Sequence, residues 1–421
     1  MFTLLRRRLW IILWPCLEGF YVLRHLQRLQ VYNKPSAHLP ISTDVQELMQ
    51  RFFTLQLVFP LEDFLRGWFL GAPFESILRN NVEEFVAYAF FCRRWSELSR
   101  KEADQIAHFT TQCEKTWNVR FQQGNNPHIS FMAHLWEPLR VCHKPVIVHL
   151  FSEVARATNS VWMLALGFRK QCCEDTSYWT LSRKICREEK PEEPIVFLHG
   201  VGMGLGPYFF WVMDLLRTFS RHTIILVEYD HISLRLHSSK VLFDSIAHQL
   251  SKIIIRAGFS KACIVGHSFG TFVASRLCKL HPEVVESLVL IDAVCLLTCW
   301  PGLLYNFIYR KPACSLDGKG CLDVLRFICS RDLMIAEAFC RDFSWSALML
   351  WPEDMPPRTV ICMSGQDRLV PNSLILRHLR AVDSSAQVVE DKDASHGTFL
   401  LPQCKKWRDV ILSGMTAVIK P

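Results

Sequence analysis

The chain has 421 residues, which suggests two or three domain-sized units; half of the residues are apolar and 21% are charged. The net charge is +8, but no run of five like charges and no basic patch mixed with aromatic residues occurs. The charge therefore argues against nucleic-acid binding and indicates at most a weak attraction to anionic lipid.

The 17 cysteines are scattered without the spacing of zinc ligands, and the chain has no Asn-x-Ser/Thr sequon. We interpret most of these cysteines as small apolar side chains in a reducing compartment, so we expect the body of the protein to face the cytosol. Disulfides in a lumenal compartment are the alternative.

Residues 1–31 are predicted to be a membrane anchor. Three arginines, Arg6 to Arg8, precede an apolar run that ends at Leu23, and no small-x-small cleavage site follows. The run is shorter than the roughly 20 residues that cross a bilayer. It also contains Glu18, and an acid at mid-bilayer costs about 2.5–3.5 kcal/mol. We expect either an oblique signal-anchor or a helix lying in the membrane interface; a buried N-terminal helix is the alternative.

Residues 32–190 are predicted to be a mainly helical region that follows a proline-containing linker. Apolar residues recur there at intervals of three and four, which is typical of helices. The expected helical stretches are 44–59, 66–91, 98–121 and 145–166. The last stretch is apolar but contains charged residues, so we interpret it as a core or interface helix. A short extended segment is expected within 175–187.

Residues 191–421 alternate short β-branched runs with amphipathic stretches, which predicts a mainly parallel, doubly wound sheet with helices on both faces. The expected strands are 195–198, 223–227, 263–265, 284–292, 358–363 and 386–390. The alternation is interrupted at 293–355 by helix-like, aromatic-rich sequence. We predict that this insert caps a site, with aromatic side chains suited to an apolar group: Trp300, Phe307, Phe327, Phe343 and Trp345.

The sequence Gly266-His-Ser-Phe-Gly270 lies between a predicted strand and a predicted helix. A turn this sharp forces Ser268 into a strained conformation, and the flanking glycines remove side chains that would collide. The pattern predicts that Ser268 is presented at the carboxyl end of the sheet as a nucleophile.

A serine nucleophile needs a histidine base and a carboxylate that orients the imidazole. The chain order Ser268, Asp367, His396 fits, because Asp367 and His396 each follow a predicted strand. Asp292, at another strand end, is the main competitor for the acid. Asp391 and Asp393 are too close to His396 in sequence. A simple turn aspartate and a loop histidine are the alternative interpretations.

The backbone amides of Val201 and Phe269 are predicted to form the oxyanion hole. His199 is expected to shape the loop that contains Val201. The glycines at 200, 202 and 204 resemble a phosphate loop only loosely, and no Lys-Ser/Thr follows them, so nucleotide binding is not expected. The predicted chemistry needs no cofactor and no metal.

These motifs, from about residue 194 onward, resemble the α/β-hydrolase superfamily. The N-terminal segment, Arg66-Gly-Trp-Phe-Leu-Gly-Ala-Pro73, Tyr305-Asn-Phe-Ile-Tyr-Arg310 and Phe343-Ser-Trp345 further resemble a eukaryotic, often fungal, branch of membrane-anchored serine hydrolases. The resemblance implies hydrolysis of an ester or lipid. Antiparallel strands before the His-Gly strand are not evident, so a shortened sheet is expected. Leu401 occupies the acid position of the His-x4-Asp signature of acyltransferase relatives.

The sequence therefore predicts a serine hydrolase that cleaves a carboxylic ester, with a lipid ester as one candidate substrate and membrane lipid as a partner. An acyltransferase that uses the same three residues is the first alternative. A catalytically silent lipid-binding or scaffold protein is the second, because a fold does not guarantee activity.

Overall fold

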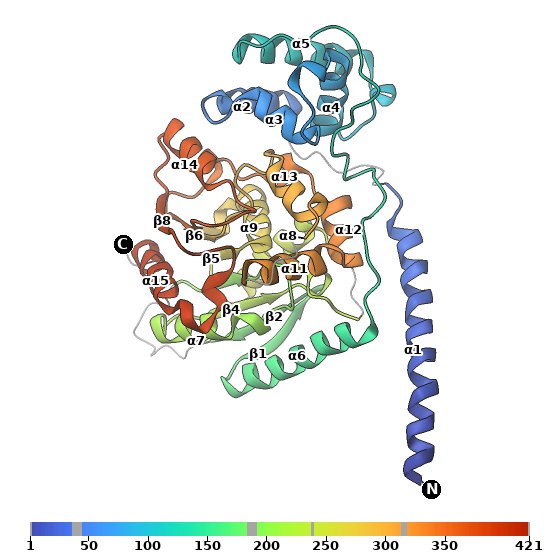
Figure 1. Ribbon diagram of the computed structural model, residues 1–421. Coiled ribbons are helices and arrows are strands. Elements are labelled where there is room, and N and C mark those ends of the chain that lie inside the picture. Colours follow the sequence, from blue (N-terminus) through green and yellow to red (C-terminus); the bar gives the residue numbers. More distant parts are fainter. Residues whose placement is uncertain (1, 36–43, 183–191, 237–239, 313–317, 420–421) are drawn as a thin grey trace.

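The computed structural model describes residues 2–35, 44–182, 192–236, 240–312 and 318–419. Its centre is an eight-stranded sheet in the order β1-β2-β4-β3-β5-β6-β7-β8, drawn in the lower body of Figure 1. Strands β3 to β8 run parallel, whereas β2 pairs antiparallel with both β1 and β4. The strands are β1 (Arg169–Cys173), β2 (Thr176–Leu181), β3 (Ile195–Leu198), β4 (Ile224–Glu228), β5 (Ala262–His267), β6 (Val285–Ile291), β7 (Thr359–Ser364) and β8 (Gln387–Asp391).

The six predicted strands are confirmed, and the sheet is longer than expected at one edge. β1 and β2 form a hairpin with the two-residue loop Glu174-Asp175, in which Glu174 has a φ of 53°. The first two strands of the sheet therefore precede residue 191, where the sequence placed the start of this domain. The expectation of a shortened sheet was wrong, because β1 is a polar edge strand without an apolar pattern.

Helices cover both faces of the sheet. One hydrophobic cluster joins one face to α7 and α15, and a larger cluster joins the other face to α8, α9 and α14. These helices are α7 (Phe209–Thr218), α8 (Phe243–Arg256), α9 (Phe269–Leu280), α14 (Asn372–Ala381) and α15 (Lys405–Ile419). The central strands are fully buried and rich in Val, Ile and Leu, as expected of a parallel sheet covered on both sides.

The described part of the segment predicted as an insert contains four α-helices and packs between the sheet and the N-terminal helices. They are α10 (Gly302–Leu304), α11 (Gly318–Ser330), α12 (Leu333–Arg341) and α13 (Trp345–Leu348). The N-terminal helices are α2 (Val45–Phe53), α3 (Leu61–Trp68), α4 (Arg79–Phe91) and α5 (Arg100–Thr116), grouped at the top of Figure 1. They share one continuous hydrophobic cluster with the insert and with one face of the sheet.

Two further helices flank this body. α1 (Phe2–Tyr32) extends away from the body, so that the N-terminus lies far from the sheet, and α6 (Val146–Ala165) precedes β1 (Figure 1). Among the described residues, no helix combines the length and apolar character required to cross a membrane.

Candidate active site

Ser268 lies on a sharp turn between β5 and α9. Its φ of 51° and ψ of −120° are a strained combination for a residue with a side chain. The flanking glycines are required by contact: a Cβ on Gly270 would lie 2.1 Å from the carbonyl oxygen of Leu198, and one on Gly266 would lie 3.0 Å from the carbonyl oxygen of Gly270. The sequence pattern around Ser268 therefore results from close packing of β5, α9 and β3.

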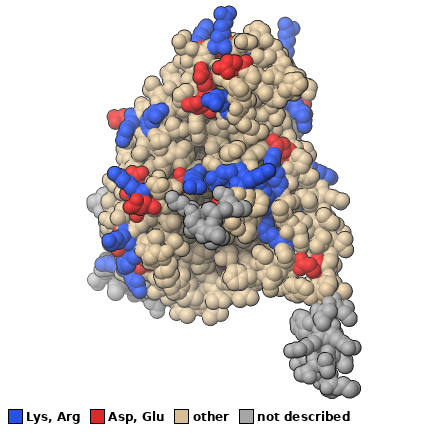
Figure 2. All heavy atoms as spheres, viewed as in Figure 1, with Lys and Arg blue, Asp and Glu red and all other residues tan. Residues whose placement is uncertain are grey.

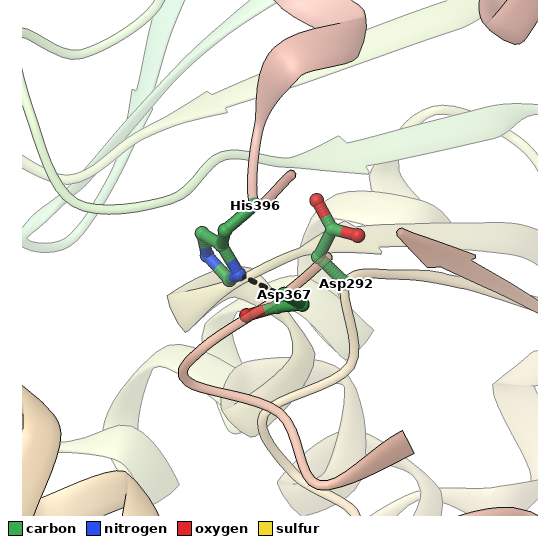
Figure 3. Close-up of side chains that lie close together, drawn as sticks. All are labelled: Asp292, Asp367 and His396. Carbon is green, nitrogen blue, oxygen red and sulfur yellow. Dashed lines mark hydrogen bonds and ion pairs between the residues drawn. The ribbon is translucent and has the colours of Figure 1, made fainter. Parts of the chain in front are cut away.

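The side chains of Ser268, His396 and Asp367 form one hydrogen-bonded chain. His396 Nε2 lies 2.8 Å from Ser268 Oγ, and His396 Nδ1 lies 2.6 Å from Asp367 Oδ2. Asp367 Oδ1 also accepts from the amides of Leu369 and Val370. Figure 3 shows the imidazole directed at Asp367, which comes from the loop after β7. This pattern suits a Nδ1–H that donates to Asp367 and a Nε2 that accepts from the serine.

The carboxylates favour the protonated form of His396. Burial alone lowers the pKa of this imidazole, but the charge and hydrogen bond of Asp367, together with the charge of Asp292, outweigh burial and raise the pKa to about 9. The Asp367 side chain is 1% exposed, so its interaction with the imidazole is poorly screened by water. The site therefore stabilises the imidazolium that forms when a serine proton is transferred.

The two amides predicted for the oxyanion hole lie on segments that meet at Ser268. The Phe269 amide is the first of α9 and has no acceptor within that helix. The loop after β3 lies against Ser268, since a Cβ on Gly200 would be 3.0 Å from the Ser268 Cβ. His199 fixes this loop, because its Nδ1 lies 2.7 Å from the Gly200 oxygen and its Nε2 accepts from the Tyr229 amide.

Comparison with known protein families agrees with this fold. A family model described as "Alpha/beta hydrolase family" matches residues 195–404. Residues 195–404 belong to the α/β-hydrolase superfamily. The fold predicted from the sequence is thus confirmed.

Individual relatives are more distant. A putative esterase/lipase from Haemophilus influenzae is 31% identical over 103 residues, which are 23% of this chain and 33% of that protein. This chain thus spans about a third of the length of that curated relative. A carboxylesterase structure from Nitrososphaera gargenis has 13% identity and a TM-score of 0.42, covering 60% of this chain and 99% of its own. A 2-hydroxy-6-oxo-6-phenylhexa-2,4-dienoate hydrolase from Rhodococcus sp. strain RHA1 has 17% identity and a TM-score of 0.40, covering 60% and 98%.

A second buried network, which the sequence analysis missed, links the two loops of the α/β-hydrolase site. Tyr208 Oη accepts from the Gly200 amide at 2.7 Å and lies 2.7 Å from His267 Nδ1, so its proton is available to that nitrogen. His267 Nε2 is 3.7 Å from Asp292 Oδ2, an ion-pair distance too long for a hydrogen bond. The same oxygen of Asp292 accepts from the Gly397 amide at 2.7 Å.

This network gives Asp292 a position beside the imidazole of His396 without a hydrogen bond to it. Asp292 fixes the backbone of the histidine loop, whereas Asp367 contacts the imidazole itself (Figure 3). Of the two acids that the sequence offered, Asp367 is therefore the one hydrogen-bonded to the imidazole. His267 could have been suspected from its place beside Ser268 in the elbow, but Tyr208 carries no sequence signal.

The insert reaches the oxyanion side of the site through one residue that the sequence analysis did not single out. Phe339 of α12 lies 6.0 Å from Phe269 between ring centroids and 4.4 Å from Phe307. Two of the aromatic residues expected at the site instead face the N-terminal helices. Trp345 donates to the Ala89 oxygen, and the Trp300 ring packs on Phe59.

Asp292, Asp367 and His396 are also the one group of described residues that could hold a metal ion, with ligand atoms within 4.8 Å of one another. The atoms facing the imidazole are already used: Asp367 Oδ2 interacts with His396, and Asp292 Oδ2 accepts from Gly397. This donor set is explained by hydrogen bonds within the protein and does not require an ion.

Proposed function

We propose that the protein is a serine hydrolase that cleaves a carboxylic ester, with Ser268 as nucleophile, His396 as base and Asp367 as the orienting acid. The observation that carries the proposal is the imidazole of His396, which lies 2.8 Å from the serine oxygen and 2.6 Å from the carboxylate. This separation is within the hydrogen-bond reach that proton transfer requires.

In the proposed reaction, Ser268 Oγ attacks the ester carbonyl carbon while its proton passes to His396 Nε2. The amides of Val201 and Phe269 stabilise the resulting oxyanion, an effect of about 10²–10³ in rate for one such donor. Collapse of the intermediate breaks the bond to the alcohol, which takes the proton from His396 and leaves an acyl ester on Ser268. Water then attacks this ester by the same steps and releases the carboxylic acid.

A lipid ester is the substrate class that the surroundings favour. Phe269, Phe339 and Phe307 place aromatic carbon beside the proposed oxyanion hole, which suits an acyl chain better than a charged group. The names of the Haemophilus protein and the Nitrososphaera structure, a putative esterase/lipase and a carboxylesterase, agree with an ester substrate. We further propose that residues 1–31 associate with membrane lipid and that the body faces the cytosol; the described cysteines are free thiols.

A fluorophosphonate probe tests the nucleophile without knowledge of the substrate. We expect covalent labelling of the wild-type protein and none of Ser268→Ala, with Ser275→Ala, a buried serine further along α9, as a matched control that labels normally. Undiminished labelling of Ser268→Ala would remove the proposal. A panel of esters with increasing acyl length then defines the substrate.

Product analysis separates hydrolysis from acyl transfer. If competing alcohols capture the acyl group in preference to water, the acyltransferase alternative holds. If the wild-type protein does not react with the probe but copurifies with lipid, the catalytically silent alternative holds.

A further inference from the structure

Helix α6 exposes apolar side chains and buries polar ones, the reverse of an ordinary surface helix. Its most exposed residues are apolar apart from one threonine, with Phe151 64% and Val161 69% exposed. The border of this side carries Arg156, whose side chain is 41% exposed and pairs with Glu153. The exposed residues of α6 are Ile147, Phe151, Val154, Ala157, Thr158, Val161, Leu164 and Ala165. A surface helix normally turns its polar side to water, and a contiguous apolar surface of this kind marks an interaction site.

Three of the five buried residues of α6 are polar, and hydrogen bonds hold this inner side. Ser152 Oγ donates to the Ser233 oxygen at 2.9 Å, and His149 Nδ1 lies 3.2 Å from the Leu234 oxygen. Buried Arg235 donates to the Ser152 oxygen at 3.0 Å. Because these bonds fix the rotation of the helix, α6 cannot turn its apolar side inward without leaving buried polar groups unpaired.

Exposed apolar side chains also occur on the helices next to α6. At the far end of α6, the Trp162 ring lies 4.4 Å from Phe209, which is 40% exposed. At the near end, Glu18 of α1 accepts from the Val146 amide, so it caps the first turn of α6. The part of α1 on either side of Glu18 has these exposed apolar side chains: Leu13, Trp14, Leu17, Phe20 and Leu23.

A cationic cavity lies where α1 meets α6. Its volume is about 280 Å³, and its cationic lining comes from α1 and from the segments that adjoin α6, with Asp332 as its one acid. The cationic lining residues are Arg24, Arg28, Lys144 and Arg235. Burial lowers the pKa of the two lining imidazoles, His25 and His149, and so favours their neutral forms. Lys144 is 8% exposed, and its Nζ makes no hydrogen bond; the nearest carboxylate oxygen, of Asp332, is 3.5 Å away. Leu17, Phe20 and Leu150 line the same cavity.

We propose that α6 and the neighbouring part of α1 form a docking surface for an anionic phospholipid bilayer, with the cavity receiving a headgroup phosphate. An apolar helix face beside a cluster of cations matches the two layers of a membrane interface, acyl carbon and anionic headgroups. The space-filling view agrees, since the surface over α6 in the lower part of Figure 2 is mostly uncharged. Because the inner side of α6 is bonded to the body, the helix lies on the bilayer and does not cross it.

The docking surface is close to the proposed catalytic site. α6 contacts Ser233 and Leu234, and in the same segment the Ile232 oxygen accepts from the Gly202 amide in the loop that contains Val201. If α6 docks on a bilayer, the segment that contains Ser233 and Leu234 therefore lies between the bilayer surface and the loop of the proposed oxyanion hole. Only the identity of the cleaved substrate rests on the proposed function, because binding to vesicles needs no catalysis.

The test is flotation of the full-length protein with phosphatidylcholine vesicles, with and without phosphatidylserine. We expect Phe151→Glu/Val161→Glu to reduce the partition coefficient at least about ten-fold, because two exposed apolar side chains no longer enter the interface. A matched control is Leu57→Glu/Ile255→Glu, which changes two apolar residues of similar exposure, 61% and 60%, elsewhere on the surface. The control should bind as the wild type does. Lys144→Met should reduce the increase in partition coefficient that phosphatidylserine produces.

Wild-type partitioning of the α6 double variant would overturn the proposal. A dimeric wild-type protein whose Phe151 is protected from carbene footprinting without vesicles would also overturn it, because the face would then cover a second copy. Loss of the phosphatidylserine effect in the control as well would refute the headgroup role of the cavity. Fluorophosphonate labelling of the same variants in solution, without vesicles, reports on catalysis separately, so failure of docking and failure of the proposed function are distinguishable.

Discussion

Replacing each of the two buried acids by its amide tests which one supports the imidazole of His396. Asp367 Oδ2 lies 2.6 Å from His396 Nδ1. In Asp367→Asn this partner loses its charge and can present an N–H, which favours the wrong tautomer of the imidazole. The corresponding change in serine proteases lowers the rate by about 10⁴, or about 5.4 kcal/mol at 1.36 kcal/mol per factor of ten. In Asp292→Asn, the amide oxygen can still accept from Gly397, so we expect a loss of no more than about ten-fold.

The assay is the second-order rate of fluorophosphonate labelling, measured above pH 9 so that His396 is neutral in each variant. Asp393→Asn, an exposed acid in the same loop as His396, is the matched control and should react at the wild-type rate. If Asp292→Asn were the slower variant and Asp367→Asn reacted normally, the assignment of the acid would be refuted.

Three further outcomes are expected. The labelling rate should fall as the pH drops below about 9. The carboxylates raise the pKa of His396 to about 9, and only the neutral imidazole is a base. A pH-independent rate between 6 and 9 would contradict this. Gly270→Ala should lower the free energy of unfolding by about 1–3 kcal/mol in a denaturant titration, since its Cβ would lie 2.1 Å from the Leu198 oxygen. Glu18→Ala should lower the free energy of unfolding by about 0.5–2 kcal/mol, because the Val146 amide loses its acceptor. It should also speed amide hydrogen exchange at the start of α6. Unchanged exchange would argue against the cap.

The α/β-hydrolase half of the fold was predictable because its signals are local. A buried parallel strand is a β-branched apolar run, and the elbow requires glycines at 266 and 270 for steric reasons. The sequence also placed Asp367 and His396 after consecutive strands, and the structure brings their side chains within 2.6 Å of each other.

What the sequence did not reveal depends on partners distant in the chain. β1 reads as Arg-Lys-Gln-Cys-Cys and is a strand because β2 pairs with it. The role of Phe339 depends on how α12 folds back over α9. The orientation of α6 was not predictable. The spacing of its apolar residues shows that the helix has two different faces, but it does not show that the polar face is buried against Ser233 and Leu234.

The β1–β2 hairpin has a practical consequence for any attempt to isolate the α/β-hydrolase half. A fragment that starts at residue 191 would leave β4 as a bare edge, with its Ile224–Glu228 backbone open to pairing with other molecules. It would also remove the N-terminal helices from Trp300 and Trp345 and expose both indoles to water. We expect such a fragment to aggregate on expression, whereas a fragment that starts before helix α2 keeps both surfaces covered.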